Sequence, residues 1–358
     1  MYPWCRLGSV RIEENKELAP LTTFGVGGPA RWFVEAETEA DVVDAVAWAM
    51  AHEVPLFVLG GGSNLLVADN GFPGLVVRVS LQGIQPTESK GQAGERRYEV
   101  AAGEDWDGFV QRTVEENCAG LECLAGIPGT VGGTPVQNVG AYGQEVASTI
   151  VRVRAFDRRG NSMVELSAEE CGFSYRRSRF NTVDRERYII VAVEFRLAPD
   201  GAPSLEYSDL QRAFPAGSDP SLAQVAQAVR KIRRSKGMLI VEGDPDCRSA
   251  GSFFKNPVVG REQAASISRV AGAEAPQFKA GADSDYVKIS AAWLIERAGF
   301  AKGYRQGRAA ISSKHTLALV NLGGATAAEI VGLAEQIRSR VLDRFSTELQ
   351  MEPVMLGF

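Results

Sequence analysis

Residues 126–133 read Gly126-Ile127-Pro128-Gly129-Thr130-Val131-Gly132-Gly133, and this stretch does most to decide the fold. Glycine lets bare backbone N–H groups approach an anion closely. A loop of the same kind, Gly60-Gly61-Gly62-Ser63-Asn64, lies earlier in the chain and directly follows residues 55–59, which we expect to form a short buried strand. We call residues 60–64 the first glycine loop and residues 126–133 the second. A tight turn explains any one such loop equally well. Several within about 110 residues favour a pyrophosphate held by loops.

A third glycine-rich segment, residues 25–30, matches the dinucleotide pattern G-x-G-x-x-A. That pattern requires a helix after it, so that phosphate meets a helix N-terminus. Here residues 31–35 follow and alternate like a strand, so the dinucleotide interpretation fails. Residues 60–64 also lack the Gly-Lys-Ser/Thr ending of a P-loop.

The composition is that of a folded globular protein. The chain has 358 residues, of which 45% are hydrophobic and 23% charged, enough for two to three domains with their own cores. Its formal net charge of −5 gives no overall attraction to nucleic acid or to an anionic membrane. No run of about 18 apolar residues occurs that could span a membrane.

Cysteine and histidine usage argues against a metal site. None of the five cysteines forms a C-x-x-C pair, and His52 and His315 are the only histidines, so we expect no metal. Residues 1–6 contain no apolar signal core. We therefore expect reduced cysteines and a cytoplasmic protein. The cysteines are Cys5, Cys118, Cys123, Cys171 and Cys247.

Hydrophobic periodicity predicts a mixture of helices and strands. We expect helices over 38–49, 106–118, 221–234, 291–298 and 326–345, and strands over 55–59, 65–67, 75–79, 150–154, 163–166, 188–197 and 317–320. The basic cluster at residues 230–234 is interpreted as a solvated helix end. Residues 199–220 form a polar stretch that contains proline and glycine, and residues 237–258 read as irregular. The fold class is α+β.

The two glycine loops resemble the two halves of the flavin site in the FAD-binding fold of vanillyl-alcohol oxidase-type enzymes. Further motifs follow in order, and together they resemble the UDP-N-acetylenolpyruvoylglucosamine reductase family from about residue 22 to residue 352. One motif would be weak support, but five in the right order are specific: the first glycine loop, the second loop with its continuation, and three later motifs. The continuation is Pro135-Val136-Gln137-Asn138-Val139-Gly140-Ala141-Tyr142-Gly143. The later motifs are Tyr175-Arg176-Arg177-Ser178-Arg179-Phe180, Ala250-Gly251-Ser252-Phe253-Phe254-Lys255-Asn256-Pro257 and Met351-Glu352-Pro353.

The resemblance implies an α+β architecture of the FAD-binding PCMH/vanillyl-alcohol oxidase type. Two α+β lobes would bind FAD, and a C-terminal α+β domain would bind the substrate. The first lobe would span residues 1–82, with residues 346–358 folding back onto it. The second lobe would span 83–220, and the substrate domain 236–345.

The resemblance also implies a reaction. FADH₂, formed by NADPH, would deliver a hydride to the terminal carbon of an enolpyruvyl ether in peptidoglycan precursor synthesis. Ser252 would protonate the neighbouring carbon, and Arg176 and Glu352 would polarise the carboxylate and stabilise the enolate. A guanidinium suits this role because it forks onto a carboxylate through two hydrogen bonds. The sequence leaves open whether Glu352 is ionised or protonated.

Each of these residues alone has an ordinary explanation: a buried turn serine, a surface ion-pair partner, a carboxylate before proline. Their joint placement in the family pattern favours the catalytic interpretation. The implied FAD contacts are Gly60, Gly61, Gly62, Ser63, Asn64, Leu65, Gly126, Ile127, Pro128, Gly129, Thr130, Gly132, Gly133, Asn138, Gly140, Ala141 and Tyr142. The implied substrate contacts are Tyr175, Tyr207, Lys255 and Asn256. For Tyr207, closing a loop over the diphosphate and simply anchoring a loop are equally good interpretations.

FAD is expected to bind without a covalent bond, because His52 lies on a predicted helix and the cysteines avoid the glycine loops. NADPH has no fingerprint of its own, and the family uses one cleft for NADPH and the sugar nucleotide in turn. We expect a monomer with small-molecule partners only. Two alternatives remain: a related FAD oxidase that uses dioxygen, and a non-catalytic nucleotide-sugar binding protein.

Overall fold

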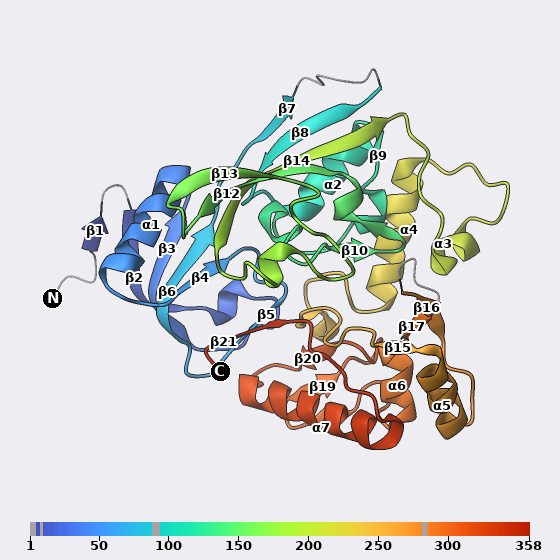
Figure 1. Ribbon diagram of the computed structural model, residues 1–358. Coiled ribbons are helices and arrows are strands. Elements are labelled where there is room, and N and C mark those ends of the chain that lie inside the picture. Colours follow the sequence, from blue (N-terminus) through green and yellow to red (C-terminus); the bar gives the residue numbers. More distant parts are fainter. Residues whose placement is uncertain (1–4, 8–9, 88–93, 281–284) are drawn as a thin grey trace. The chain divides into compact units, whose positions relative to one another are not determined.

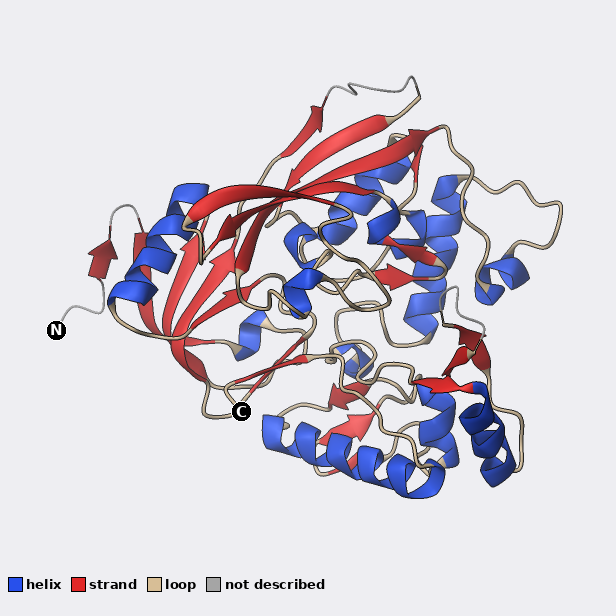
Figure 2. Ribbon diagram, in the orientation of Figure 1, coloured by secondary structure: helices blue, strands red, loops and turns tan. Residues whose placement is uncertain are grey.

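A computed structural model describes residues 5–7, 10–87, 94–280 and 285–358 (Figure 1). The chain divides into two compact units, each built from separate stretches of sequence. The first unit consists of Met1–Lys16, Ala30–Gly62 and Phe72–Arg234, and the second of Glu17–Pro29, Ser63–Gly71 and Ser235–Phe358. Helices and sheets occur in both units, in agreement with the predicted α+β class (Figure 2). The three-lobe division expected from the sequence stays a prediction.

One sheet of the first unit contains the strand that ends at the first glycine loop. Its strands run in the order β1 (Cys5–Leu7), β2 (Val10–Glu17), β3 (Pro29–Ala36), β6 (Phe72–Val79) and β4 (Leu56–Leu59). Helix α1 (Glu39–Ala51) begins with a capping box between Thr38 and Asp41, as the sequence indicates. The glycine segment 25–30 runs into β3, so no helix follows it.

The other large sheet of the first unit has six strands. The order is β13 (Ser162–Ser167), β12 (Ile150–Asp157), β14 (Tyr188–Pro199), β8 (Arg96–Ala101) and β7 (Ile84–Thr87), and β9 (Cys118–Ala119) pairs with the end of β14. Helix α2 (Trp106–Glu115) ends before residue 118, so the predicted length was wrong. Asn117 takes a left-handed conformation (φ 53°) that ends the helix, and the chain then enters β9, which pairs with β14.

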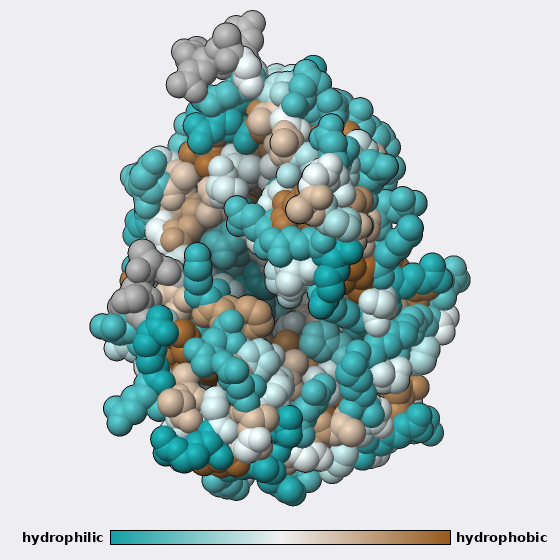
Figure 3. Space-filling view, turned by 90° about the vertical axis from the view of Figure 1, so that its right-hand side faces the viewer, coloured by the Kyte–Doolittle hydropathy of each residue, from teal (hydrophilic) through white to brown (hydrophobic). Residues whose placement is uncertain are grey.

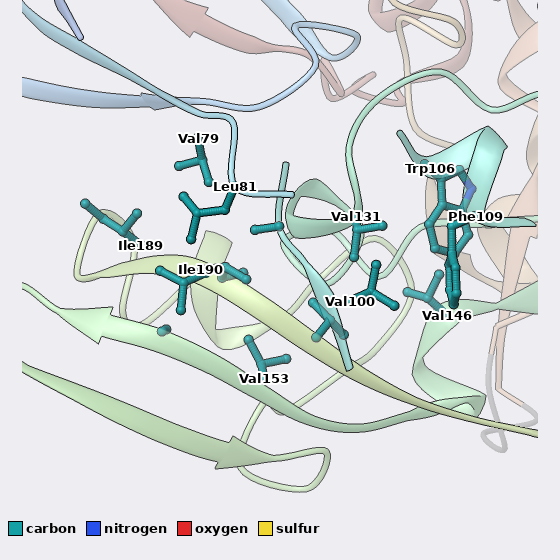
Figure 4. Packing of buried hydrophobic residues seen from close by; sticks show 14 of the residues in the cluster. Val79, Leu81, Val100, Trp106, Phe109, Val131, Val146, Val153, Ile189 and Ile190 are labelled. Atoms are coloured by element: carbon teal, nitrogen blue, oxygen red, sulfur yellow. The ribbon is translucent and has the colours of Figure 1, made fainter. Parts of the chain in front are cut away.

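The core of the first unit lies against one face of this six-stranded sheet. Figure 4 shows Val100 and Val153 from the strands in the same buried cluster as Trp106 and Phe109 from α2. All four side chains are completely or almost completely buried, so each stabilises the fold by about 1.5–3 kcal/mol relative to exposure. On β12, Arg152 is only partly buried and bonds Glu194 (2.7 Å) and Glu165 (2.9 Å).

Shorter elements complete the first unit: β10 (Gly140–Ala141), β11 (Gln144–Glu145), α3 (Ser208–Ala213) and α4 (Leu222–Ser235). Helix α3 lies in the polar stretch 199–220, for which no helix was predicted. Helix α4 buries Val225, Val229 and Arg233 at four-residue spacing. The solvated-end interpretation of the basic cluster is therefore wrong for Arg233, which continues the buried stripe.

The second unit is assembled around the C-terminal part of the chain. Its strands are β5 (Leu65–Val67) parallel to β21 (Val354–Leu356), then β15 (Val258–Gly260), β17 (Tyr286–Ile289) and β16 (Gln277–Lys279), and β18 (Arg305–Gln306), β19 (Ala309–Ile311) and β20 (Leu319–Asn321). Its helices are α5 (Arg261–Ala271), α6 (Ala291–Arg297) and α7 (Ala327–Phe345). Thr326 and Glu329 form the predicted capping box of α7, and the Asp69 carboxylate accepts from the N–H groups of Ala327 and Ala328.

Close packing explains two glycines of the segment 25–30. A Cβ atom on Gly27 would lie 2.4 Å from the Cβ of Val67, and one on Gly28 would lie 2.3 Å from the carbonyl oxygen of Asp69. Both contacts are far shorter than a van der Waals separation, so only glycine fits there. This segment serves packing within the second unit.

Hydrophilic residues cover most of the face seen in Figure 3, and hydrophobic residues form small separate patches on it. Across the part of the chain that the structure describes, no helix has both the length and the apolar character needed to cross a membrane.

Candidate active site

Backbone hydrogen bonds to residues 102 and 106 hold the second glycine loop, residues 126–133. The Gly129 carbonyl accepts from the N–H of Trp106 (3.1 Å), and the N–H of Gly132 donates to the Ala102 carbonyl (2.8 Å). A Cβ atom on Gly132 would lie 2.6 Å from the Cβ of Ala102. These contacts restrict the loop to one backbone conformation.

The two glycine loops touch each other within the first unit. A Cβ atom on Gly61 would lie 2.6 Å from the Cα of Gly129, and one on Gly60 would lie 2.8 Å from Oγ1 of Thr130. Within the described residues, the backbone N–H groups of Gly61, Gly129 and Thr130 donate no hydrogen bond to another protein group. Backbone N–H groups gathered in this way suit an anion such as a pyrophosphate.

Two arginines that the sequence analysis did not select support this loop. Asp107 accepts from the N–H of Gly126 (2.6 Å) and from Arg230 (Nη2 to Oδ1, 2.7 Å). The buried Arg233 donates from Nε to the Gly126 carbonyl (3.0 Å). Only the four-residue spacing of Val225, Val229 and Arg233 could have indicated that an arginine of this cluster points inward.

The continuation of the second loop forms a small hairpin, β10–β11. Tyr142 and Gly143 occupy its turn with φ values of 51° and 89°, a pair typical of a two-residue hairpin turn. The buried Tyr142 ring meets Tyr207 edge-on at 5.3 Å between centroids. Burial raises the pKa of Tyr142 to about 12, so the phenol stays neutral. Gly140 and Ala141 form the strand that enters this turn.

Arg176 lies in a tight turn of the first unit. Ser174 and Arg177 exchange two backbone hydrogen bonds, of 2.9 and 3.0 Å, which places Tyr175 and Arg176 at the turn. Arg176 has a left-handed backbone (φ 56°), a conformation that costs about 1–2 kcal/mol for a residue other than glycine. Its guanidinium carbon lies 5.7 Å from the Tyr175 ring centroid.

Ser252 and Glu352 are brought together in the second unit. The N–H of Glu352 donates to the Phe253 carbonyl (2.9 Å), and an antiparallel bridge joins Phe254 to Met351. Phe253 and Phe254 are almost completely buried, whereas Ser252 and Glu352 are each partly exposed. The two candidate catalytic residues therefore stand on adjoining backbone segments.

The end of the first glycine loop meets the same segments. Asn64 donates from Nδ2 to the Glu352 carbonyl (3.3 Å) and accepts at its own carbonyl from the N–H of Val354 (2.9 Å). Thr23 Oγ1 bonds the Ser249 carbonyl (2.6 Å) and lies 3.4 Å from the Ser63 carbonyl. Gly60, Gly61 and Gly62 belong to the first unit, and Ser63, Asn64 and Leu65 to the second.

The two remaining candidate substrate residues follow Ser252. Lys255 is partly buried, and its N–H donates to the Gln350 carbonyl (2.9 Å). Asn256 accepts at Oδ1 from the N–H of Ala291 (2.9 Å), the first residue of α6. This bond fixes the carboxamide and leaves its NH₂ group as the end that faces other partners.

The segment 237–249 belongs to the stretch that reads as irregular from the sequence, and it is a compact loop around a short 3₁₀ turn (Pro245–Cys247). Asp244 pairs with Lys314, and Asp246 accepts from the N–H (2.8 Å) and hydroxyl (2.6 Å) of Ser313. The Cys247 thiol donates to the Leu239 carbonyl (2.8 Å). These contacts hold the backbone that leads into Ser252.

Comparison with known proteins defines the class. Residues 30–166 match the FAD binding domain, and residues 244–356 match the C-terminal domain of UDP-N-acetylenolpyruvoylglucosamine reductase. Together with the paired glycine loops, this makes the chain a flavin-dependent oxidoreductase that binds FAD. In the described ranges, no group of three or more His, Cys, Asp or Glu side chains could hold a metal ion.

Relatives identify the family. The UDP-N-acetylenolpyruvoylglucosamine reductase of Streptomyces coelicolor is 46% identical over 98% of this chain and 92% of its own length. That of Thermobifida fusca is 46% identical over 96% of this chain and 97% of its own. The crystal structure of the Thermus caldophilus reductase covers 97% of this chain and 100% of its own, with 28% identity and a TM-score of 0.67. This chain belongs to the UDP-N-acetylenolpyruvoylglucosamine reductase family, which confirms the resemblance and the predicted fold class.

Proposed function

We propose that this protein uses NADPH and bound FAD to reduce the enolpyruvyl group of UDP-N-acetylglucosamine-enolpyruvate to UDP-N-acetylmuramate, a step of peptidoglycan synthesis. The relatives that bear the reductase name cover nearly the whole chain, which supports this substrate. The unengaged N–H groups of Gly61, Gly129 and Thr130 would hold the FAD pyrophosphate. The other glycine-loop and hairpin residues predicted from the sequence, except Asn138, would line the cofactor.

Reduction of the enolpyruvyl double bond requires one hydride and one proton. When bound, the flavin supplies the hydride, which goes to the terminal vinyl carbon. The electron pair of the double bond then moves toward the substrate carboxylate, and Arg176 binds that carboxylate through its guanidinium. Positive charge placed where the enolate develops lowers the barrier. Ser252 donates its hydroxyl proton to the carbon beside the ether oxygen, which completes the saturated product.

Glu352 has two possible tasks in this scheme, and they differ in charge. As a protonated acid it would donate a hydrogen bond to the substrate carboxylate, and as a carboxylate it would help to replace the proton that Ser252 gives up. Its backbone bond to Phe253 keeps it beside Ser252 in either case. This pairing of the two segments is the observation that best supports the proposal.

The remaining assignments follow from the same scheme. Tyr175, Tyr207, Lys255 and Asn256 would bind the sugar nucleotide. FAD would be held without a covalent bond, because the His52 ring is stacked on Trp48 and the Cys123 thiol is bonded to the Ser204 carbonyl. NADPH and the sugar nucleotide would occupy one cleft in turn, in a monomeric cytoplasmic enzyme.

The experiment follows the visible spectrum of the purified protein without oxygen. The flavin band should bleach on addition of NADPH and return when the enolpyruvyl sugar nucleotide is added. A band that bleaches but returns only in air would point to the oxidase alternative. No flavin band, even after FAD is supplied, would leave a nucleotide-sugar binding protein.

The Ser252→Ala variant separates the two half-reactions. Flavin reduction by NADPH should continue, whereas reoxidation by the enolpyruvyl substrate should fall by about 10²–10⁴-fold, the usual contribution of a positioned acid. Unchanged reoxidation would remove Ser252 from the mechanism.

A further inference from the structure

We propose that Asn138 and Asn181 are positioning residues that hold the Arg176 turn in its active geometry. The proposal rests on the proposed function, because Arg176 is given its role there. It assigns to Asn138 a task that differs from the cofactor contact expected from the sequence. It also brings in Asn181, which no motif selected.

The side chain of Asn138 joins the hairpin to the Arg176 turn. Its Nδ2 donates to the Ser174 carbonyl (3.1 Å) and to Oε2 of Glu145 (2.8 Å), and its Oδ1 accepts from the N–H of Ala147 (3.1 Å). These partners fix the orientation of the amide, because an N–H must face the oxygen and two acceptors must face the NH₂ group. Both amide hydrogens are used within the protein, and the residue is 1% exposed.

Asn181 holds the other side of the same turn. Its Nδ2 donates to the carbonyl of Arg176 (3.2 Å), and its Oδ1 accepts from the N–H of Ser178 (3.0 Å). The buried Ser178 in turn donates from Oγ to the Val136 carbonyl (2.6 Å), in the continuation of the second glycine loop. The turn is therefore tied to that continuation at two places, through Asn138 and through Ser178.

These bonds oppose an unfavourable backbone. The left-handed conformation of Arg176 persists only if its surroundings enforce it. The net contribution of one side-chain hydrogen bond is similar in size to the cost of one left-handed residue, so the bonds to Ser174 and Arg176 together can offset that cost. Without them the turn can relax, and the guanidinium moves with its backbone. A misplacement of about 1 Å lowers catalysis strongly even when the side chain itself is intact.

Two variants test the proposal. Asn181→Ala removes the bond to Arg176 at a site outside the glycine loops. Asn138→Gly removes the bond to Ser174 and keeps the left-handed backbone (φ 45°) acceptable. Asn117→Gly is the matched control, since Asn117 is also left-handed (φ 53°) and also donates a side-chain bond, to Asp200 (2.7 Å), but does not contact the Arg176 turn.

The measurement is the rate of each half-reaction in anaerobic stopped flow, with FAD-loaded full-length protein. Both variants should slow reoxidation by the enolpyruvyl sugar nucleotide about tenfold. Flavin reduction by NADPH should stay within about twofold, and Asn117→Gly should change neither rate. In an Arg176→Ala background, Asn181→Ala should slow reoxidation no further, because a positioning residue acts only through the group it positions.

Three results would overturn the proposal: no slowing in either variant, equal slowing of both half-reactions, or the same slowing with and without Arg176. If Asn138→Gly yields no folded protein, Asn181→Ala alone decides. If the unmodified enzyme is not reoxidised by this substrate at all, the proposed function fails, and the role of the two asparagines falls with it.

Discussion

In the first unit Arg176 occupies a left-handed turn that side-chain amides hold in place, whereas in the second unit Ser252 and Glu352 stand on segments joined backbone to backbone. The first arrangement depends on the identity of a few polar side chains. The second depends on buried aromatic rings beneath the paired segments, since backbone bonds survive most substitutions. Changes at the Arg176 turn should therefore alter catalysis with little loss of stability, and changes in the rings beneath Ser252 and Glu352 should do the reverse.

The largest effect is expected at Arg176. Arg176→Ala should lower the rate of flavin reoxidation by the enolpyruvyl sugar nucleotide by about 10²–10³-fold, because the enolate loses its main countercharge. The free energy of unfolding should change by less than about 1 kcal/mol. Stopped-flow absorbance and urea titration measure the two quantities. Arg177→Ala, in the same turn, is the control, and an equal loss of rate there would show that the turn rather than the guanidinium matters.

At Phe254, beneath Ser252, we expect a large loss of stability rather than a large loss of catalytic rate. Phe254→Ala should lower the free energy of unfolding by about 3 kcal/mol or more, because the ring is 1% exposed and leaves a cavity. The control is Phe278→Ala, whose ring is 43% exposed and which should cost well under half as much. Urea unfolding followed by fluorescence gives both values. Similar losses at the two positions would contradict the packing argument.

A smaller effect is expected where the glycine loops touch. Gly61→Ala should weaken FAD binding by about 10–100-fold, because its Cβ would lie 2.6 Å from Gly129 and would push the loops apart. Gly260→Ala is the control, since a Cβ there meets nothing within 4 Å and its φ is −64°. Fluorescence titration of the apoprotein with FAD measures the dissociation constant. If both variants bind FAD equally, the loop contact does not shape the cofactor site.

The smallest effect is a pH dependence in the second unit. Burial lowers the pKa of His315 to about 4, and nearby Lys236 and Lys302 act in the same direction. His315 Nδ1 accepts from the N–H of Leu317 (3.3 Å), whose carbonyl accepts from Phe253, next to Ser252. As the pH falls, His315 is protonated near pH 6.5 in the unfolded chain, but only at a lower pH in the folded protein. The stability that neutral His315 contributes is therefore complete above pH 6.5 and is lost as the pH falls toward 4.

Between pH 6.5 and 5.5 this loss should amount to about 1 kcal/mol. His315→Gln should remove that part of the pH dependence, because glutamine does not titrate. Urea titrations at several pH values measure the difference between the two proteins. Parallel stability curves would show that His315 does not contribute.

The sequence predicted most of the secondary structure because periodicity and capping are local properties. Thr38 and Thr326 mark helix starts that the structure confirms. The end of α2 was misplaced, because a strand partner from β14 captures Cys118–Ala119. Arg233 was misjudged because its burial depends on the Gly126 carbonyl, which is far away in the sequence. Asn181 was missed for a different reason, since its partner Arg176 is near in the sequence but contributes a backbone atom, which carries no sequence signal.

The pairing of β21 with β5 has a consequence for the order of synthesis. Val354 lies opposite Leu65, so β5 leaves the ribosome long before its partner exists. The same delay affects Asn64, which meets Glu352 and Val354 only at the end. Contacts between such distant parts of a chain form late. During translation the end of the first glycine loop therefore lacks its hydrogen-bond partners Glu352 and Val354. The second unit can be completed only after residue 354 has emerged from the ribosome.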